Sequence, residues 1–198
     1  FEENDEYYTL RLSDGAYVNA RYVVGADGAN SIVRKKLYPN CKIKTYTAVQ
    51  QWFNADKQLP LYLCAFDSEI TDSYCWGISK DSNFILGGAF AGARPTERLE
   101  LQKAKLERFG VVLGDPVKTE ACLVLRPNGF NFCHGKDRCF LIGEAGGFIS
   151  PSSFEGISNA MNTAIALAEC FMPANSICSA YKKATASLRR KLLLKCFK

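Results

Sequence analysis

Residues 140–157, FLIGEAGGFISPSSFEGI, decide the fold expected for this chain. The stretch Cys139–Ile142 is short and fully apolar, as in a strand buried in a parallel sheet. A glycine-rich loop runs from Gly143 to Gly156, and a helical pattern begins at Ile157. Glycines let the backbone approach a ligand closely, and the first turn of a helix presents unpaired N–H groups. We therefore expect a strand–loop–helix unit that faces an electron-rich group.

A second strand–turn–helix unit lies near the start of the chain, at residues 24–34, VGADGANSIVR. An apolar strand brings Asp27 to its carboxyl end, and Gly28 permits a sharp turn. Asn30 or Ser31 then caps a short helix. Ligands of open α/β sheets bind outside the carboxyl ends of strands, so Asp27 is a candidate binding residue. Taken alone, an Asp-Gly pair before a helix is also an ordinary tight turn.

Both units resemble FAD-linked fingerprints of the geranylgeranyl reductase and aromatic hydroxylase superfamily of FAD-dependent oxidoreductases. In the fingerprint that residues 24–34 resemble, the Asp-Gly pair is followed by Ser and Arg at the offsets of Ser31 and Arg34. The resemblance implies FAD as the cofactor of the full-length protein and NAD(P)H as an electron donor. It also implies that the two loops converge on one flavin site at the edge of a sheet. The FAD-binding residues carried over are Asp27, Gly28, Arg34, Gly143, Glu144, Pro151, Gly156 and Ile157.

Two positions in residues 140–157 bear on the reaction. The family pattern usually has Asp after the first glycine, and this chain has Glu144. Aromatic hydroxylases tend to carry His where Gly147 stands, and the continuation of the motif resembles the geranylgeranyl reductase branch. The resemblance therefore implies reduction of a double bond in a small apolar, isoprenoid-like substrate. Two alternatives stay open: an FAD-dependent monooxygenase of an aromatic substrate, and a flavin-free interaction protein on the same scaffold.

Residues 41–126 are expected to form an antiparallel-sheet substrate domain, because their strand-like runs are joined by turns too short for helical crossovers. Apolar residues at helical spacing indicate one helix within this region. The expected strands are residues 44–53, 61–66, 74–79, 84–90 and 119–125, and the helix is residues 95–109.

An aromatic run, YCWGISK at residues 74–80, resembles an aromatic strand with a lysine on the substrate-domain sheet of geranylgeranyl reductases. It makes Tyr74 and Trp76 candidates for an apolar substrate pocket. The competing interpretation is an aromatic-rich strand packed into a core. No residue is assigned as catalytic, although Tyr74, Cys75 and Lys80 are available as proton donors.

The expected fold class is α+β, an incomplete FAD/NAD(P)-binding fold joined to the antiparallel sheet. Residues 1–40 and 127–172 are assigned to C-terminal parts of the FAD-binding domain, and residues 173–198 to a basic helix. The chain contains no GxGxxG and starts at Phe1 without Met, so we expect a truncated piece of a longer protein. Such a piece should bind FAD weakly, be inactive by itself and self-associate through uncovered faces.

The net charge of +5 arises in one segment. Residues 181–198 hold seven Lys or Arg and no acid, and the rest of the chain has 18 basic and 20 acidic residues. This distribution excludes a body-wide nucleic-acid footprint. It leaves either a solvated helix face or peripheral contact with anionic lipid head groups. No apolar run approaches the ~20 residues of a membrane span.

Nine cysteines are spread along the chain with no CxxC pair, and His134 is the one histidine. A zinc site normally has paired ligands at short spacing, so no metal site is expected. Unpaired cysteines in apolar surroundings behave as small hydrophobic residues and indicate a reducing, cytoplasmic location.

Overall fold

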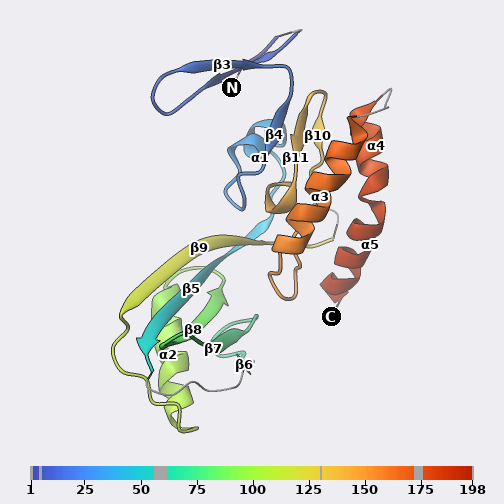
Figure 1. Cartoon of the computed structure of the whole chain (residues 1–198). Helices are drawn as coiled ribbons and strands as arrows, with labels where there is room; N and C mark the ends of the chain where they lie inside the picture. Colours follow the sequence, from blue (N-terminus) through green and yellow to red (C-terminus); the bar gives the residue numbers. More distant parts are fainter. Residues whose placement is uncertain (1, 5, 56–61, 130, 172–175, 198) are drawn as a thin grey trace. The chain divides into compact units, whose positions relative to one another are not determined.

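The computed structural model describes residues 2–4, 6–55, 62–129, 131–171 and 176–197. Its contacts divide the chain into two compact units, which are shown in Figure 1. Unit 1 comprises residues 1–44 and 125–198, and unit 2 comprises residues 45–124. The mixture of helices with largely antiparallel sheets confirms the expected α+β class. The assignment of the units to FAD-binding and substrate domains stays a prediction.

A three-stranded sheet in the order β10–β11–β4 forms the centre of unit 1. β4 (Val23–Gly25) runs parallel to β11 (Cys139–Leu141), whereas β10 (Gly135–Lys136) lies antiparallel on the other side of β11. Gly25 stands opposite Leu141 in the parallel pair. The two fingerprint strands are therefore neighbours, and both loops leave the same edge of the sheet, as expected.

Helices follow each of the two strands. α1 (Ile32–Leu37) begins after Ser31, whose Oγ accepts a hydrogen bond from the Arg34 N–H at 2.9 Å, so the predicted cap is confirmed. A short 3-10 helix, η1 (Gly143–Gly146), forms at the start of the predicted glycine-rich loop. α3 (Ile157–Cys170) follows that loop and packs against η1.

The basic C-terminal segment forms two helices, so the expectation of one helix is wrong. α4 (Ile177–Ala184) ends at Thr185, and α5 (Ala186–Leu194) follows, with a final turn η2 (Lys195–Phe197). The buried Thr185 hydroxyl donates to Tyr181 O at 2.9 Å and lies 3.0 Å from His134 Nε2. Thr185 has φ −86° and ψ 3°, so the regular helical backbone is interrupted at this residue. The expected start of the segment at residue 173 lies outside the described residues.

The N-terminal residues form a separate meander in the order β1–β2–β3. It consists of β1 (Glu2–Glu3), β2 (Tyr8–Arg11) and β3 (Tyr17–Ala20), which pair antiparallel. Tyr8 is buried and packs with Val23 of β4, so the meander is anchored to the central sheet of unit 1.

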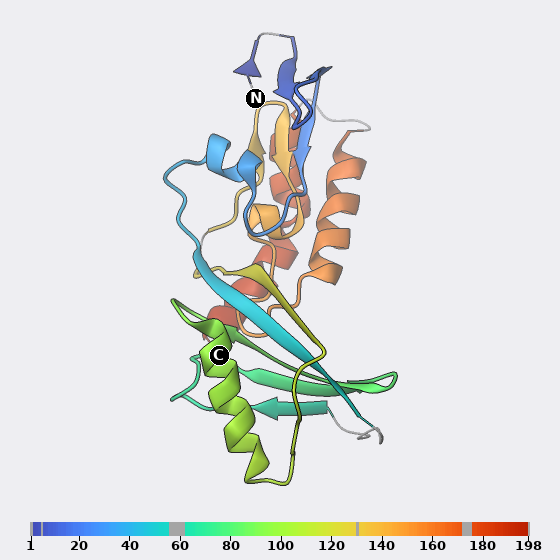
Figure 2. The same ribbon diagram turned by 90° about the vertical axis from the view of Figure 1, so that its left-hand side faces the viewer.

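Unit 2 is built on a five-stranded sheet in the order β6–β7–β8–β5–β9. One face is covered by α2 (Pro95–Glu107), as Figure 2 shows. Leu99 and Leu106 of α2 join Val49, Phe53 and Leu86 in the core. The strand at 61–66 was expected to begin at Leu61, which lies outside the described residues. The strands are β5 (Lys44–Asn54), β6 (Tyr62–Ala65), β7 (Cys75–Lys80), β8 (Asn83–Phe90) and β9 (Lys118–Arg126).

Candidate cofactor-binding site

Arg34 joins the two loops at the carboxyl edge of β4 and β11. Its side chain is only 5% exposed, and its guanidinium donates to carbonyls from both loops. Nη1 donates to Ala145 O at 2.9 Å, and Nη2 donates to Ala29 O at 2.5 Å. A planar guanidinium can hold several carbonyls at fixed positions, so Arg34 sets the spacing of the loops. The predicted residues brought together here are Asp27, Gly28, Arg34, Gly143 and Glu144.

The Asp27 carboxylate is engaged by α1. Its Oδ2 accepts hydrogen bonds from the N–H groups of Ile32 at 2.7 Å and Val33 at 3.4 Å. Burial by itself would raise the pKa of Asp27, but hydrogen bonds from Ser31 and these N–H groups outweigh it and lower the pKa. Gly28 follows with φ +67°, and a Cβ built there meets nothing within 4 Å. Asp27 therefore fixes the start of α1, and the turn beside it faces open space.

Glu144 has a carboxylate that is only partly used by the protein. Its Oε1 accepts a hydrogen bond from the Leu125 N–H at 2.6 Å. Burial raises the pKa of the Glu144 carboxyl, while the Leu125 N–H and the Arg34 charge act in the opposite direction. Within the described ranges no hydrogen bond reaches Oε2. This oxygen is an acceptor for hydroxyl groups of a ligand.

Thr163 joins η1 to α3 and was not among the predicted site residues. The Gly143 N–H donates to the buried Thr163 Oγ1 at 2.8 Å, and that hydroxyl donates to Asn159 O at 2.8 Å. Gly143 has φ +56°, and a Cβ there would lie 2.9 Å from Ala160 Cβ. A threonine inside a helix forms no motif, so only the structure identifies this contact.

The first turn of α3 offers backbone donors at the same end of unit 1. Gly156 is the N-cap and makes no side-chain cap bond, while Glu155 Oε1 accepts from the Ser158 N–H at 3.1 Å. In the part of the chain that the structure describes, the N–H groups of Gly156 and Ile157 meet no acceptor. Ile157 is 81% exposed, so this turn is open to a ligand. Pro151 is buried in the turn that precedes it.

These groups fit the part of FAD that the fingerprints imply. Glu144 Oε2 is an acceptor for ribityl hydroxyls, and the N–H groups of Gly156 and Ile157 are donors for the pyrimidine C2 carbonyl and N1. The glycine at position 28 leaves room beside them. The donor set therefore suits a flavin, although each residue's role in binding stays a prediction.

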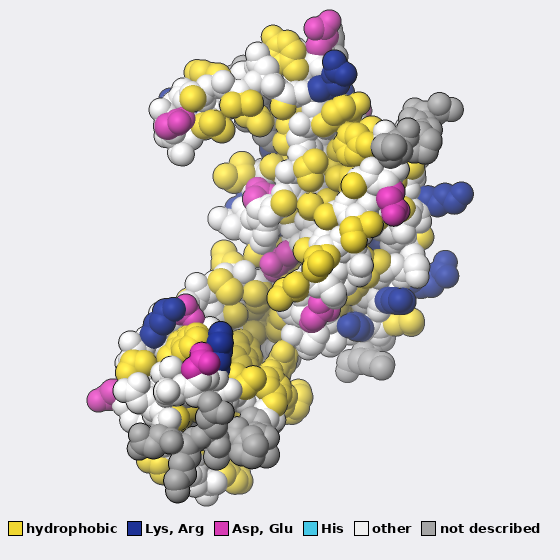
Figure 3. Space-filling view, viewed as in Figure 1, with side chains coloured by type: hydrophobic (Ala, Val, Ile, Leu, Met, Phe, Trp, Pro, Cys, Tyr) yellow, Lys and Arg dark blue, Asp and Glu magenta, His cyan; other side chains and the backbone are white. Residues whose placement is uncertain are grey.

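An apolar stripe runs along the exposed face of α3. Ile157, Met161 and Ile165 follow one another at four-residue spacing and are 81%, 62% and 54% exposed. Figure 3 shows hydrophobic side chains gathered over α3. Contiguous exposed apolar patches occur at interaction surfaces and ligand-binding grooves. The self-association expected from the sequence stays a prediction.

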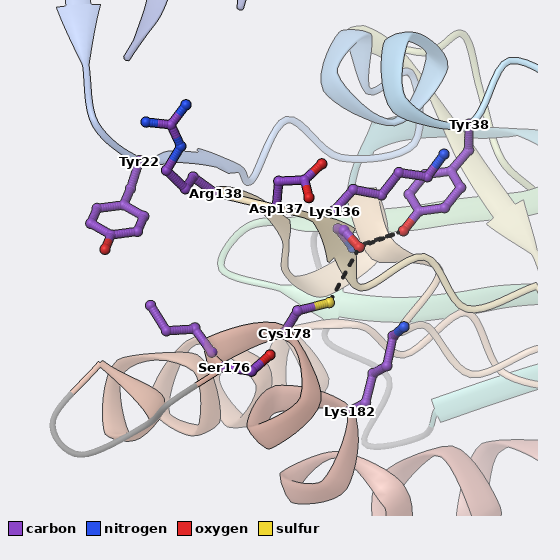
Figure 4. Close-up of a pocket in the computed structure, with 10 residues that line it drawn as sticks. Tyr22, Tyr38, Lys136, Asp137, Arg138, Ser176, Cys178 and Lys182 are labelled. Carbon is purple, nitrogen blue, oxygen red and sulfur yellow. Dashed lines mark hydrogen bonds between the residues drawn. The ribbon is translucent and has the colours of Figure 1, made fainter. Parts of the chain in front are cut away.

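A cavity of about 670 Å³ opens at the opposite, amino edge of β4 and β11 (Figure 4). Lys136, Lys182 and Cys178 are among the residues that line it. The Tyr38 hydroxyl donates to Gly135 O at 2.7 Å, and Cys178 Sγ lies 3.7 Å from the same oxygen. None of the predicted site residues lines this cavity.

Unit 2 has its own cleft, of about 390 Å³, which Trp76 lines together with Val49 and Gln50. A Cβ on Gly87 would lie 2.4 Å from the Trp76 ring, so this glycine lets the indole lie flat on β8. Tyr74 is not among the lining residues, although its ring centroid lies 5.9 Å from that of Trp76. The assignment of both side chains to a substrate pocket stays a prediction.

Glu120 lies at the rim of this cleft as an anion. Hydrogen bonds from Lys118, Gln50 and Trp52 lower the pKa of its carboxyl to about 2. Its Oε2 accepts from Gln50 Nε2 at 2.8 Å and from Trp52 Nε1 at 2.9 Å. Glu120 therefore ties β9 to β5 and gives one wall of the cleft a fixed negative charge.

Comparison with protein families covers the part of the chain that contains the Asp27 loop. A family model described as "FAD binding domain" matches residues 2–103, just over half of the chain. The chain belongs to the FAD-binding domain family. Membership confirms the resemblance to flavin-dependent oxidoreductases and monooxygenases and supports FAD as the cofactor. The expected donor, NAD(P)H, stays a prediction.

Curated relatives of this family member match its whole length. Protein CbrA of Escherichia coli O6:H1 is 45% identical over 202 residues, and Protein CbrA of Shigella flexneri serotype 5b is 46% identical over 203 residues. Each match covers 100% of the chain and 55% of the relative. The chain thus spans little more than half the length of these relatives.

Solved structures share the fold at low sequence identity. A geranylgeranyl bacteriochlorophyll reductase-like protein from Thermoplasma acidophilum has a TM-score of 0.78 at 16% identity, covering 100% of this chain and 55% of that one. Klebsiella pneumoniae HpxO, complexed with FAD and uric acid, has a TM-score of 0.65 at 18% identity, covering 98% and 56%. The flavin-dependent halogenase BrvH from Brevundimonas sp. has a TM-score of 0.63 at 18% identity, covering 93% and 38%. The fold therefore occurs with several flavin reactions.

Proposed function

We propose that the full-length protein uses FAD to reduce a double bond in an apolar, isoprenoid-like substrate. The observation that carries the flavin part is the meeting of two loops at one sheet edge, where the Arg34 guanidinium binds Ala29 O and Ala145 O. The choice of reduction is supported by Gly147, which stands where aromatic hydroxylases tend to carry His. When bound, FAD supplies the hydride for such a reduction.

The residues of this chain position the cofactor and stabilise charge. Glu144 Oε2 would orient the ribityl chain, because Oε1 is already fixed by the Leu125 N–H. The N–H groups of Gly156 and Ile157 would donate toward the pyrimidine edge, where negative charge collects on reduction. Both groups are held before the ligand arrives, so binding requires little reorganisation of the backbone.

Flavin binding is tested in the full-length protein with Glu144→Ala. Loss of a charged hydrogen-bond acceptor should weaken FAD binding by roughly ten-fold or more. Glu169→Ala is the matched control, since Glu169 is an exposed glutamate at the end of α3. The FAD dissociation constant is measured by fluorescence titration. Equal affinity in both variants would remove Glu144 from the site, and full-length protein without flavin absorbance would support the flavin-free alternative.

The reaction is tested under anaerobic conditions with the reduced full-length protein. Addition of a polyprenyl alcohol should reoxidise the flavin and give a product heavier by two hydrogens. The monooxygenase alternative is supported by the fold likeness to HpxO, which was solved with FAD and uric acid. Oxygen uptake coupled to hydroxylation of an aromatic compound, with no polyprenyl reduction, would decide for that alternative.

A further inference from the structure

Two cysteines that are 92 positions apart in the sequence lie with their sulfur atoms in contact. The Sγ atoms of Cys41 and Cys133 are 3.4 Å apart, and both thiols are free. A disulfide bond is about 2.05 Å long, so the sulfurs need to approach by little more than an ångström.

Each cysteine is tied to one of the two fingerprint units. The Cys41 N–H donates to Tyr38 O at 2.9 Å, just after α1 ends. The Cys133 N–H donates to Gly146 O at 3.0 Å, at the end of η1. Cys133 also packs with Leu141 of β11 in a small core, and Cys41 packs against the same core. A bond between the sulfurs would therefore join the two units covalently.

The two thiols differ in their exposure to solvent. Cys133 is 3% exposed, and burial together with the neighbouring Cys41 raises the pKa of its thiol to about 12. Cys41 is half-buried and is thus the more exposed of the two. An oxidant would therefore meet Cys41 first, and Cys133 would act as the resolving thiol beside it.

We propose that Cys41 and Cys133 form a reversible disulfide that clamps the two fingerprint units together. With hydrogen peroxide as oxidant, the Cys41 thiolate attacks one peroxide oxygen, and the leaving hydroxide takes a proton to give water and a sulfenic acid. Cys133 sulfur then attacks the Cys41 sulfur, and the sulfenic hydroxyl leaves with the Cys133 proton as a second water. Two thiols lose two electrons, and the peroxide is reduced to two waters. A dithiol reductant reverses the step.

The proposal does not depend on the reaction proposed above, because the contact exists within this chain. The clamp would hold the segment after α1 against η1, which Arg34 already binds through Ala145 O. Oxidation would thus fix the spacing of the loops more firmly than the hydrogen bonds alone. Closing a loop of this length should raise the melting temperature by roughly 5–10 °C.

The test oxidises the 198-residue chain with equimolar hydrogen peroxide, blocks remaining thiols with N-ethylmaleimide and maps the peptides by mass spectrometry. We expect one linked peptide that carries Cys41 and Cys133, lighter by two hydrogens, and its loss on treatment with dithiothreitol. The rise in melting temperature should occur in the wild type and in Cys64→Ser, whose cysteine is exposed. It should be absent in Cys41→Ser.

Alkylation of both Cys41 and Cys133 after oxidation, with Cys64 or Cys122 consumed instead, would overturn the proposal. If the linked peptide forms but the melting temperature of the oxidised protein does not rise, the proposal that the disulfide clamps the two units is wrong. Cys133→Ser alters the core, so Cys41→Ser, at the half-buried position, is the deciding variant. A rise in melting temperature on oxidation of Cys41→Ser would also contradict the proposal, because this variant cannot form the disulfide.

Discussion

At the residue scale, the Thr163 hydroxyl is the contact that holds η1 on α3. Thr163→Val keeps the shape of the side chain and leaves the buried Gly143 N–H without its acceptor. The free energy of unfolding should fall by about 1–3 kcal/mol, measured by urea denaturation. Thr119→Val is the control, because Thr119 is exposed on β9 and its replacement should change the value by less than about 0.5 kcal/mol. Equal effects of the two variants would refute this role of Thr163.

His134 makes the free energy of unfolding of unit 1 depend on pH. Burial, with smaller effects from Arg189 and Lys182, lowers the pKa of His134 to about 4. The unfolded chain takes up the proton near the ordinary value of about 6.5, so between these values it binds more protons than the folded chain. The contribution of the neutral His134 to the free energy of unfolding is therefore fully present above pH 6.5 and is lost as the pH falls toward 4.

The expected loss of unfolding free energy between pH 7 and pH 5 is about 2 kcal/mol. Urea denaturation at a series of pH values measures it. The control is His134→Gln, which has no imidazole to protonate and should show a flatter profile in this range. Identical slopes in the two proteins would assign the pH dependence to the carboxyl groups.

At the element scale, the glycine-rich loops contain positions with different demands on the backbone. Gly28 and Gly147 both have positive φ, +67° and +80°. A Cβ on Gly28 meets open space, whereas a Cβ on Gly147 would lie 2.7 Å from Asn131 O. Gly28→Ala should therefore cost about 1–2 kcal/mol from the left-handed backbone alone. Gly147→Ala should cost more, because the clash with backbone adds to the same strain.

Chemical denaturation of both variants measures this difference. A cost at Gly147 equal to that at Gly28 would mean that the loop before α3 shifts freely, which its buried position does not predict. The cost of a side chain at position 147 also bears on the residue that the family carries there. The His that hydroxylases tend to carry at this position would need a different path of the loop.

The chain as a whole has two stretches that resemble fingerprints for the flavin half of FAD, and it has no GxGxxG segment. In the family, that segment binds the pyrophosphate at a helix N-terminus. The 198-residue chain should therefore bind FAD with a dissociation constant weaker than about 1 μM, measured by quenching of flavin fluorescence. The full-length protein is the control. Sub-micromolar binding by the shorter chain would contradict this expectation.

The local elements and their chemistry could be predicted from the order of the residues. The Ser31 cap, the apolar strand at 139–141 and the start of α3 at Ile157 all depend on residues within a few positions of one another. The meeting of the two loops was also foreseen, but through the family resemblance. Short-range hydrogen bonds and hydrophobic periodicity leave a direct trace in the order of residues.

The contacts between groups far apart in the sequence became visible only in the folded chain. Thr163 binds the Gly143 N–H, Thr185 ends α4 beside His134, and Cys41 touches Cys133, and no motif marks any of these pairs. The engagement of Asp27 by α1 likewise appears only when the turn is built. The physical reason is that these contacts join side chains or backbone groups whose positions are set by the packing of α1, η1 and α3 on the sheet. That packing is a property of the folded chain and leaves no pattern at any fixed spacing along it.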